Sequence, residues 1–248
     1  TLTLGTLAAA LLATTAIAQE VNIYSYRQPE LLKPLTDAFT EQTDIAVNVA
    51  FLEKGLIERM KAEGKRSPAD VILTVDIARL AAVVDADLTQ SVTSQSVAQN
   101  VPAQYRDPDN HWFGLSTRAR IAYASKDRVA DGELTTYEDL ASDKWRGRIC
   151  TRSGMHDYNI ALTSAVIAHH GPEAAKTWLQ GVKDNLARRP QGNDRAQVKA
   201  IWSGECDISI GNTYYMGQML SDPEQQAWAD SVRILFPVFE NGGVHVNV

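Results

Sequence analysis

The chain has 248 residues, of which 44% are hydrophobic and 22% are charged, and its net charge is −6. This length can bury a substantial core, and the composition is that of a packed globular protein. The acidic balance argues against a general nucleic-acid binder, whose surface would be basic. Two cysteines are too few for a disulfide scaffold, although they can form one bridge.

The first eighteen residues are typical of an export signal. No charge precedes Glu20, and Ala16-Ile17-Ala18 fits the small-x-small pattern of a signal-peptidase site. A buried N-terminal helix is the alternative. We expect the mature protein to begin near Gln19, outside the cytoplasm, with no membrane-spanning segment after it.

Strand and helix signals alternate along the first half of the chain. Strands are expected at 21–26, 45–51 and 71–75. Helices are expected after them, at 29–39, 55–63 and 77–84. The continuous apolar run of the third strand is typical of burial on both faces of a parallel sheet. The first helix is expected to turn Leu31, Leu32, Leu35 and Phe39 inward. This order predicts a doubly wound α/β sheet.

The second half continues the alternation without a repeat or a Pro/Ser-rich linker. Strands are expected at 112–123, 148–151, 206–210 and 233–236. Helices are expected at 159–170, from Pro172 onward, and from Asp194, as the N-cap, to Ser203. We predict two α/β lobes joined by strands near 115–120 and 230–240. The alternating residues 243–248 stop without a polar tail, so we expect a fragment whose C-terminal part is missing.

Motifs of the common enzyme classes are absent from the sequence, which has no phosphate-binding glycine loop, no H-E-x-x-H and no G-x-S-x-G. His169 and His170 end a predicted helix, where the helix dipole explains them. An exported enzyme that uses a tyrosine or the pair His156 and Asp157 as acid and base is the remaining catalytic hypothesis. No nucleophile–base spacing stands out, so we expect a binding protein and not an enzyme.

Tyrosines and cysteines form the most informative pattern. Cys150 and Cys206 precede Tyr158 and Tyr214, respectively, by eight residues, and Tyr215 follows directly. If the cysteine strands are parallel neighbours, both tyrosines reach the rim where open α/β sheets bind ligands. A disulfide between the cysteines would lock this register, and export permits it. The tyrosine pair can also be explained as interface or core aromatics.

A hard metal ion gives tyrosines of this kind a second explanation. A phenol has a pKa of about 10, so ionising three of them at pH 7 costs about 12 kcal/mol. Ferric iron can offset this cost, because it prefers anionic oxygen, whereas zinc would recruit His and Cys. Three phenolates neutralise Fe(III), so a further anion needs positive charge. Arg27 with the first helix, or Arg118, can hold an anion such as carbonate; salt bridges are the alternative role of each arginine.

Seven segments of the chain resemble the periplasmic ferric-iron-binding proteins of bacterial ABC importers. They are YSYRQP (24–29), SPADVILTVDIARL (67–80), WFGLSTRAR (112–120), CTRSGMHDYN (150–159), ARRPQGNDRAQVKAI (187–201), GNTYYMG (211–217) and GGVHVN (242–247). The resemblance implies a two-lobe, type-II periplasmic-binding-protein fold with a ligand cleft. Lobe one is then expected at 19–117 plus 235–248, and lobe two at 118–234.

The resemblance also implies the site. Tyr158, Tyr214 and Tyr215 would be the phenolate ligands of Fe(III), carried as cargo, and lobe one would close over the ion with Arg27, Gln28 and Arg118. Since the loop at 27–30 has no His or Tyr, we expect three tyrosines plus a synergistic anion or water.

The implied function is capture of ferric iron in the periplasm by a monomer that delivers it to an inner-membrane ABC permease. The alternative is the same fold binding another solute, such as a polyamine, thiamine or an oxyanion; iron dependence of binding separates the two.

Overall fold

The computed structural model describes residues 19–248, so the expected export signal at 1–18 lies outside the described residues. The described chain divides into two compact units, 19–75 and 76–248. The lobe boundaries expected from the sequence stay a prediction. From residue 19 onward, no helix combines the length and the apolar character needed to cross a membrane.

In its described part, residues 19–75, the first unit is a three-stranded parallel sheet with two α-helices. Its elements are β1 (Glu20–Ser25), α1 (Pro29–Thr43), β2 (Ala46–Phe51), α2 (Leu56–Glu63) and β3 (Val71–Leu73). The strand order is β2-β1-β3, so β1 is central and its carboxyl end leads directly into α1. Pro29 is the first residue of α1, where a missing N–H costs nothing. The alternation predicted from the sequence is confirmed here.

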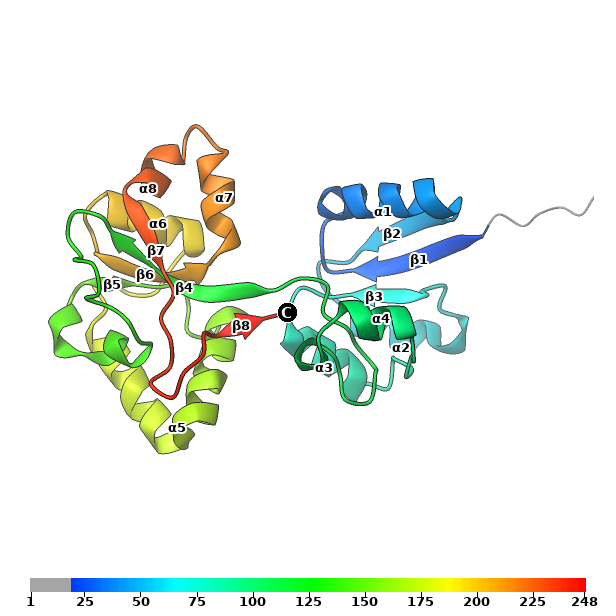
Figure 1. The fold of residues 1–248 in the computed structure, drawn as a ribbon, viewed down its shortest axis with the longest axis horizontal. Helices are drawn as coiled ribbons and strands as arrows, with labels where there is room; N and C mark the ends of the chain where they lie inside the picture. The colour runs from blue at the N-terminus through cyan, green and yellow to red at the C-terminus, as the bar shows by residue number, and fades with distance from the viewer. Residues whose placement is uncertain (1–18) are drawn as a thin grey trace, which may run out of the picture. The chain divides into compact units, whose positions relative to one another are not determined.

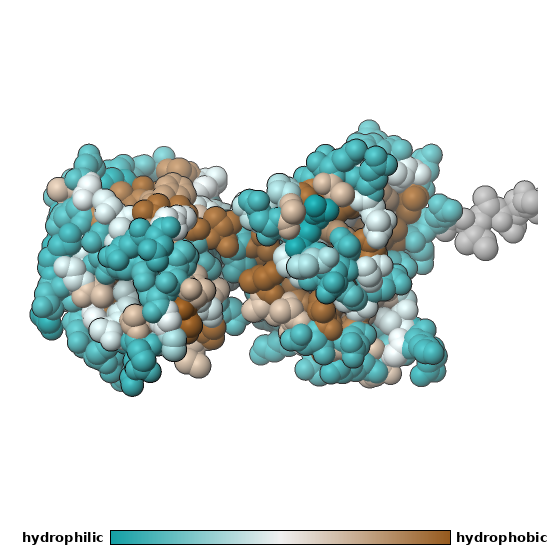
Figure 2. Space-filling model, turned by 60° about the horizontal axis from the view of Figure 1, so that its bottom comes forward, coloured by the Kyte–Doolittle hydropathy of each residue, from teal (hydrophilic) through white to brown (hydrophobic). Residues whose placement is uncertain are grey.

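Burial in the first unit differs from the sequence expectation. β3 lies at the edge of this sheet, and Val71 is 44% exposed, so the apolar run is not buried on both faces. Apolar residues reach the molecular surface (Figure 2). On α1 they are Leu31, Leu35 and Phe39, which follow one another at four-residue spacing, while only Leu32 is buried. The helix therefore turns inward a narrower face than its apolar residues predicted.

The second unit holds the larger, mixed sheet, with strand order β5-β6-β4-β7 and β8 paired to β4. β5 and β6 are parallel, whereas β4 runs antiparallel to β6, β7 and β8. Its elements are α3 (Ile77–Asp85), α4 (Gln95–Asn100), β4 (Arg118–Ser125), β5 (Ile149–Cys150), α5 (Asp157–Asp184), α6 (Asp194–Trp202), β6 (Ile208–Asn212), α7 (Tyr214–Leu220), α8 (Gln226–Asp230), β7 (Val232–Leu235) and β8 (Val246–Asn247).

Two apolar clusters lie on opposite faces of this sheet, as the alternation along β4 requires. Ala122 and Ala124 pack in the cluster that contains α5, whereas Ile121 and Tyr123 pack in the cluster that contains α6, α7 and α8. Figure 1 shows α5 on one side of the strands and α6 on the other. Both faces of the sheet are thus buried, so a ligand-binding site can form only at the ends of its strands.

Three local expectations are refined by the structure. Gly171, at φ 81° and ψ 168°, breaks α5 into the two helices that Gly171-Pro172 predicted. The strand expected from 112 begins only at Arg118. Asn193, not Asp194, caps α6, since its side chain accepts from the Ala196 amide at 3.0 Å. Asp194 is instead the first helical residue and is fully buried.

Candidate metal centre

The three predicted tyrosines come from two segments that follow neighbouring strands. Tyr158 is the second residue of α5, after β5, whereas Tyr214 and Tyr215 begin α7, directly after β6. Since β5 and β6 are parallel neighbours, both segments leave the sheet at its carboxyl edge. The parallel pairing that was the condition for bringing the tyrosines to one rim is present, although Cys150 aligns with Ser209.

The phenol groups of this tyrosine cluster lie within contact distance of one another. The hydroxyl oxygens of Tyr158 and Tyr214 are 3.2 Å apart, close enough to share a hydrogen bond. The rings of Tyr214 and Tyr215 have centroids 4.3 Å apart. Tyr214 is 38% exposed, so the cluster is open to solvent on one side. An interior packing role does not explain hydroxyls that converge at the surface.

The environment keeps these phenols neutral in the free protein. Burial, with the hydrogen bond to Tyr214 as the second cause, raises the pKa of Tyr158 to about 12. Burial also raises the pKa of Tyr214 and of Tyr215 above the ordinary phenol value. A bound cation would have to displace the protons, because pH alone does not remove them near neutrality.

Positive charge surrounds Tyr158. The guanidinium carbons of Arg118 and Arg152 each lie 5.3 Å from the centroid of its ring, and that of Arg120 lies 5.6 Å away. Arg118 Nη2 is buried and has no hydrogen-bond partner among residues 19–248. The structure therefore places Arg118 beside the cluster. Arg152 was not predicted as a site residue from the sequence, although it stands six residues before Tyr158 in the segment 150–159.

A buried polar network lies next to the tyrosines and was also missed. Arg120 is 2% exposed and donates to Asp194 at 2.6 Å, to Asn159 at 2.7 Å and to Asn212 at 3.1 Å. Asp194 also accepts from the backbone amide of Asn212 at 3.1 Å and from Arg152 at 3.3 Å. The sequence feature that could have indicated this network is Arg120 itself, a charged residue inside an otherwise apolar strand.

Arg27 and Gln28 belong to the first unit. They follow β1, where the Arg27 amide donates to Ser25 Oγ at 2.8 Å, and Gln28 is the N-cap of α1. Their expected role toward an anion at the tyrosine cluster stays a prediction.

Two further observations bear on the metal hypothesis. Cys150 and Cys206 form the expected disulfide, with their Cα atoms 5.9 Å apart. Within residues 19–248, no group of three or more His, Cys, Asp and Glu side chains is arranged to hold a metal ion. A site of the kind that zinc prefers is therefore missing from this part of the chain, and phenol oxygens are the donors that converge.

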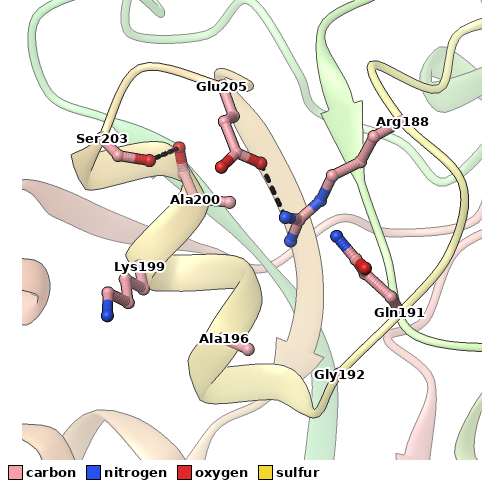
Figure 3. Close-up of a pocket in the computed structure, with 8 residues that line it drawn as sticks. All are labelled: Arg188, Gln191, Gly192, Ala196, Lys199, Ala200, Ser203 and Glu205. Carbon is pink, nitrogen blue, oxygen red and sulfur yellow. Dashed lines mark hydrogen bonds and ion pairs between the residues drawn. The ribbon is translucent and has the colours of Figure 1, made fainter.

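A separate pocket of about 370 Å³ lies along α6 (Figure 3). Arg188 and Lys199 bring positive charge to its lining, and Glu205 brings negative charge. Arg188 and Glu205 are paired at 2.6 Å across it, while the Lys199 ammonium sits 5.0 Å from the ring of Trp228. The opposite charges of Arg188 and Glu205 pair with each other, and none of the three tyrosines lines the pocket, so the tyrosine cluster remains the candidate site.

The chain is similar to iron-binding proteins along most of its length. It is 45% identical to iron uptake protein A1 of Synechocystis over 233 residues, which are 93% of this chain and 65% of that protein. Ferric iron-binding protein A of Mannheimia haemolytica, solved in an open conformation, is 52% identical, with a TM-score of 0.89 over 93% of this chain and 73% of that one. A Trichodesmium protein solved in complex with iron and citrate is 44% identical, with a TM-score of 0.87 over 92% of this chain and 73% of that one.

These likenesses confirm the α/β class and the periplasmic-binding-protein fold expected from the sequence. The chain nevertheless spans only 65% of the length of its Synechocystis relative. Residues 66–245 match the bacterial extracellular solute-binding protein family, which is most of the chain. The chain therefore belongs to the bacterial extracellular solute-binding protein family.

Proposed function

We propose that this protein binds Fe(III) as cargo, outside the cytoplasm, through the phenolates of Tyr158, Tyr214 and Tyr215. The observation that carries the proposal is the convergence of three phenol groups from two segments at one sheet edge, with the Tyr158 and Tyr214 oxygens 3.2 Å apart. Its relatives support it, since a ferric iron-binding protein and an iron uptake protein share 52% and 45% of its residues over the matched regions.

The chemistry of the cluster suits a trivalent cation. Phenols with raised pKa values are poor ligands for weakly acidic ions, because each must lose its proton on binding. Three phenolates balance the charge of Fe(III), which removes the cost of burying an unpaired charge. Capture of an ion in this way needs no bond to be made or broken in a substrate, so the proposed role is transport and not catalysis.

An anion is proposed to complete the coordination. Arg118 lies beside Tyr158 with a buried, unpartnered Nη2, and Arg152 brings a second positive charge to the same ring. A carbonate or a carboxylate such as citrate would meet donors there that suit its oxygens. The Trichodesmium relative was solved with iron and citrate together, which agrees with a mixed coordination sphere. Delivery of the ion to an ABC permease in the inner membrane completes the proposal.

Titration with ferric nitrilotriacetate tests the assignment directly. A phenolate-to-iron charge-transfer band should appear in the visible spectrum and saturate at about one ion per chain. The band should vanish in the triple variant Tyr158→Phe, Tyr214→Phe, Tyr215→Phe. Tyr105→Phe, which removes a phenol outside the cluster, is the matched control and should leave the band unchanged.

Two results would contradict the proposal. A wild-type protein that stays colourless with ferric iron does not bind through phenolates. A triple variant that retains both the colour and the affinity places the ion elsewhere. Tight binding of a polyamine, thiamine or an oxyanion without any dependence on iron would favour the alternative solute class.

A further inference from the structure

We propose that Arg120, held by Asp194, is a positioning residue that fixes the two tyrosine-bearing segments against each other so that one ion meets their phenolates together. This inference rests on the proposed function of the tyrosine cluster. It concerns Arg120, Asp194, Asn159 and Asn212, which we name the Arg120 network.

The need for such a device follows from the chain itself. Tyr158 and Tyr214 are separated by 56 positions in the sequence and begin different helices. A metal site requires its donors to be held within about half an ångström of the working geometry. The strands beneath them fix the segments only up to the ends of β5 and β6. Something beyond the sheet must therefore set where the two helices start.

Arg120 is placed to do this because its guanidinium contacts both segments. One nitrogen, Nη2, donates to Asn159 Oδ1 at 2.7 Å, and Asn159 is the residue after Tyr158. The other, Nη1, donates to Asn212 Oδ1 at 3.1 Å, and Asn212 stands two residues before Tyr214. A planar guanidinium fixes both contacts in one geometry, which a flexible ammonium does not.

Each asparagine also makes hydrogen bonds to the segment in which it lies, so its contact with Arg120 helps to fix that segment. Asn159 Nδ2 lies 3.2 Å from the carbonyls of Arg152 and of Ser153, which anchors the turn that precedes α5. Asn212 Nδ2 lies 3.4 Å from the Tyr214 hydroxyl. The Asn212 carbonyl accepts from the Tyr123 hydroxyl at 2.7 Å. The hydrogen bonds of the network therefore connect Tyr123, in strand β4, with Tyr214, a proposed ligand.

Asp194 orients the guanidinium and adds a third attachment. Its carboxylate is fully buried and contacts Arg120 Nη1 at 2.6 Å. The same group accepts from the Asn212 amide at 3.1 Å and from Arg152 at 3.3 Å. At the first turn of α6 the helix dipole favours a carboxylate. Asn193 supplies the cap, so the Asp194 carboxylate is left to hold the network.

Stability alone does not account for this arrangement. A buried ion pair is often no more stabilising than apolar residues of the same volume, because removing both charges from water is costly. Geometric specificity is an attested reason to bury an ion pair, and here the buried contacts end on Asn159, next to Tyr158, and on Asn212, two residues before Tyr214.

The test compares Arg120→Lys with Arg128→Lys in the full chain. Lysine keeps the charge that faces Asp194 but cannot contact both asparagines in the planar geometry of a guanidinium. Arg128 is the matched control, since it also pairs with an aspartate, Asp207, at 2.5 Å, and follows the opposite end of β4. Ferric iron affinity is measured by competition with citrate, together with the charge-transfer band and the thermal midpoint of the apo-protein.

We expect Arg120→Lys to weaken iron binding by about tenfold or more and to shift the band maximum, as loss of a residue that orients metal ligands does. Arg128→Lys should lower the thermal midpoint while affinity and band stay at wild-type values. Asn159→Ala leaves the Arg120–Asp194 pair intact and removes the Arg120 contact beside Tyr158, together with the contacts of Asn159 to the turn before α5. It should weaken binding in the same direction.

Three other outcomes would contradict either the positioning role of Arg120 or the proposed function. If both Arg120→Lys and Asn159→Ala fold and bind iron with wild-type affinity and an unshifted band, the positioning role is wrong while the proposed function stands. If the wild type shows no band, the proposed function itself fails. If Arg120→Lys does not fold, Asn159→Ala decides, and wild-type binding by that variant overturns the inference.

Discussion

Loading the tyrosine cluster with ferric iron is expected to release about three protons per ion, one from each phenol. Burial raises the pKa of Tyr158 to about 12 and raises the pKa of Tyr214 and of Tyr215 above the ordinary phenol value. All three side chains are therefore protonated in the free protein between about pH 6 and pH 8. An ion that is bound by three phenolates has to displace all three protons.

The sign and size of the pH effect follow from this count. The free protein binds more protons than the loaded protein, so raising the pH favours loading. Each released proton changes the binding free energy by about 1.4 kcal/mol per pH unit. Three protons give about a thousandfold change in affinity for the aqueous ion per pH unit, and Tyr214→Phe should reduce this to about a hundredfold.

A back-titration at constant pH measures the release. Ferric nitrilotriacetate is added in pulses to weakly buffered protein, and a blank without protein corrects for protons exchanged by the chelate and by iron hydrolysis. The charge-transfer absorbance, recorded in the same cell, gives the ions bound. A coloured complex that releases two protons or fewer per bound ion would refute the reasoning that every phenol in the cluster ionises.

Two further predictions concern the scaffold of the site. Replacing Cys150 and Cys206 together by Ala should lower the free energy of unfolding by about 2–4 kcal/mol, since the disulfide closes a loop with a sequence separation of 56. Urea denaturation measures this change, and an unchanged urea midpoint of unfolding would contradict the prediction. Gly211→Ala should destabilise the protein by about 1–3 kcal/mol, because the new Cβ would clash with the ring of Tyr123. Gly154→Ala is the control, since its Cβ meets nothing within 4 Å, and its stability should match that of the wild type.

The tyrosine cluster could be predicted from the sequence because it depends on local pattern and on one rule of sheets. Short strands before Tyr158 and before Tyr214 are visible as apolar segments, and parallel neighbours end at the same edge. The disulfide expectation used the same information. The family resemblance then assigned the chemistry, which strand pattern alone left open between a metal site and ordinary aromatic packing.

The Arg120 network could not be predicted in this way. Arg120 and Asp194 are separated by 74 positions, and each has an ordinary local explanation, one as a break in a strand and the other as a helix start. The expected N-cap role of Asp194 was wrong by one residue, because Asn193 makes that contact. Only the fold shows that the carboxylate is left to pair with an arginine.

Burial was the other quantity that single-residue patterns did not determine. The apolar run that includes Val71 matches an interior strand in composition, but within residues 19–248 β3 pairs on one side only, with β1. Likewise, α1 packs against β2 but leaves Leu35 65% exposed. Exposure depends on which elements are adjacent, and adjacency is a property of the whole fold.

The state of the free cluster explains why a rigid support is needed. Without an ion, Tyr158 and Tyr214 attract each other through a shared hydrogen bond, and burial keeps both neutral. As phenolates they would lose that bond and repel each other, so the contact that aligns the free site opposes the loaded one. The ion supplies attraction only after it has arrived. The geometry that it meets must therefore be set by groups other than the ligands themselves, and the buried contacts of Arg120 with Asp194, Asn159 and Asn212 lie at the base of both segments.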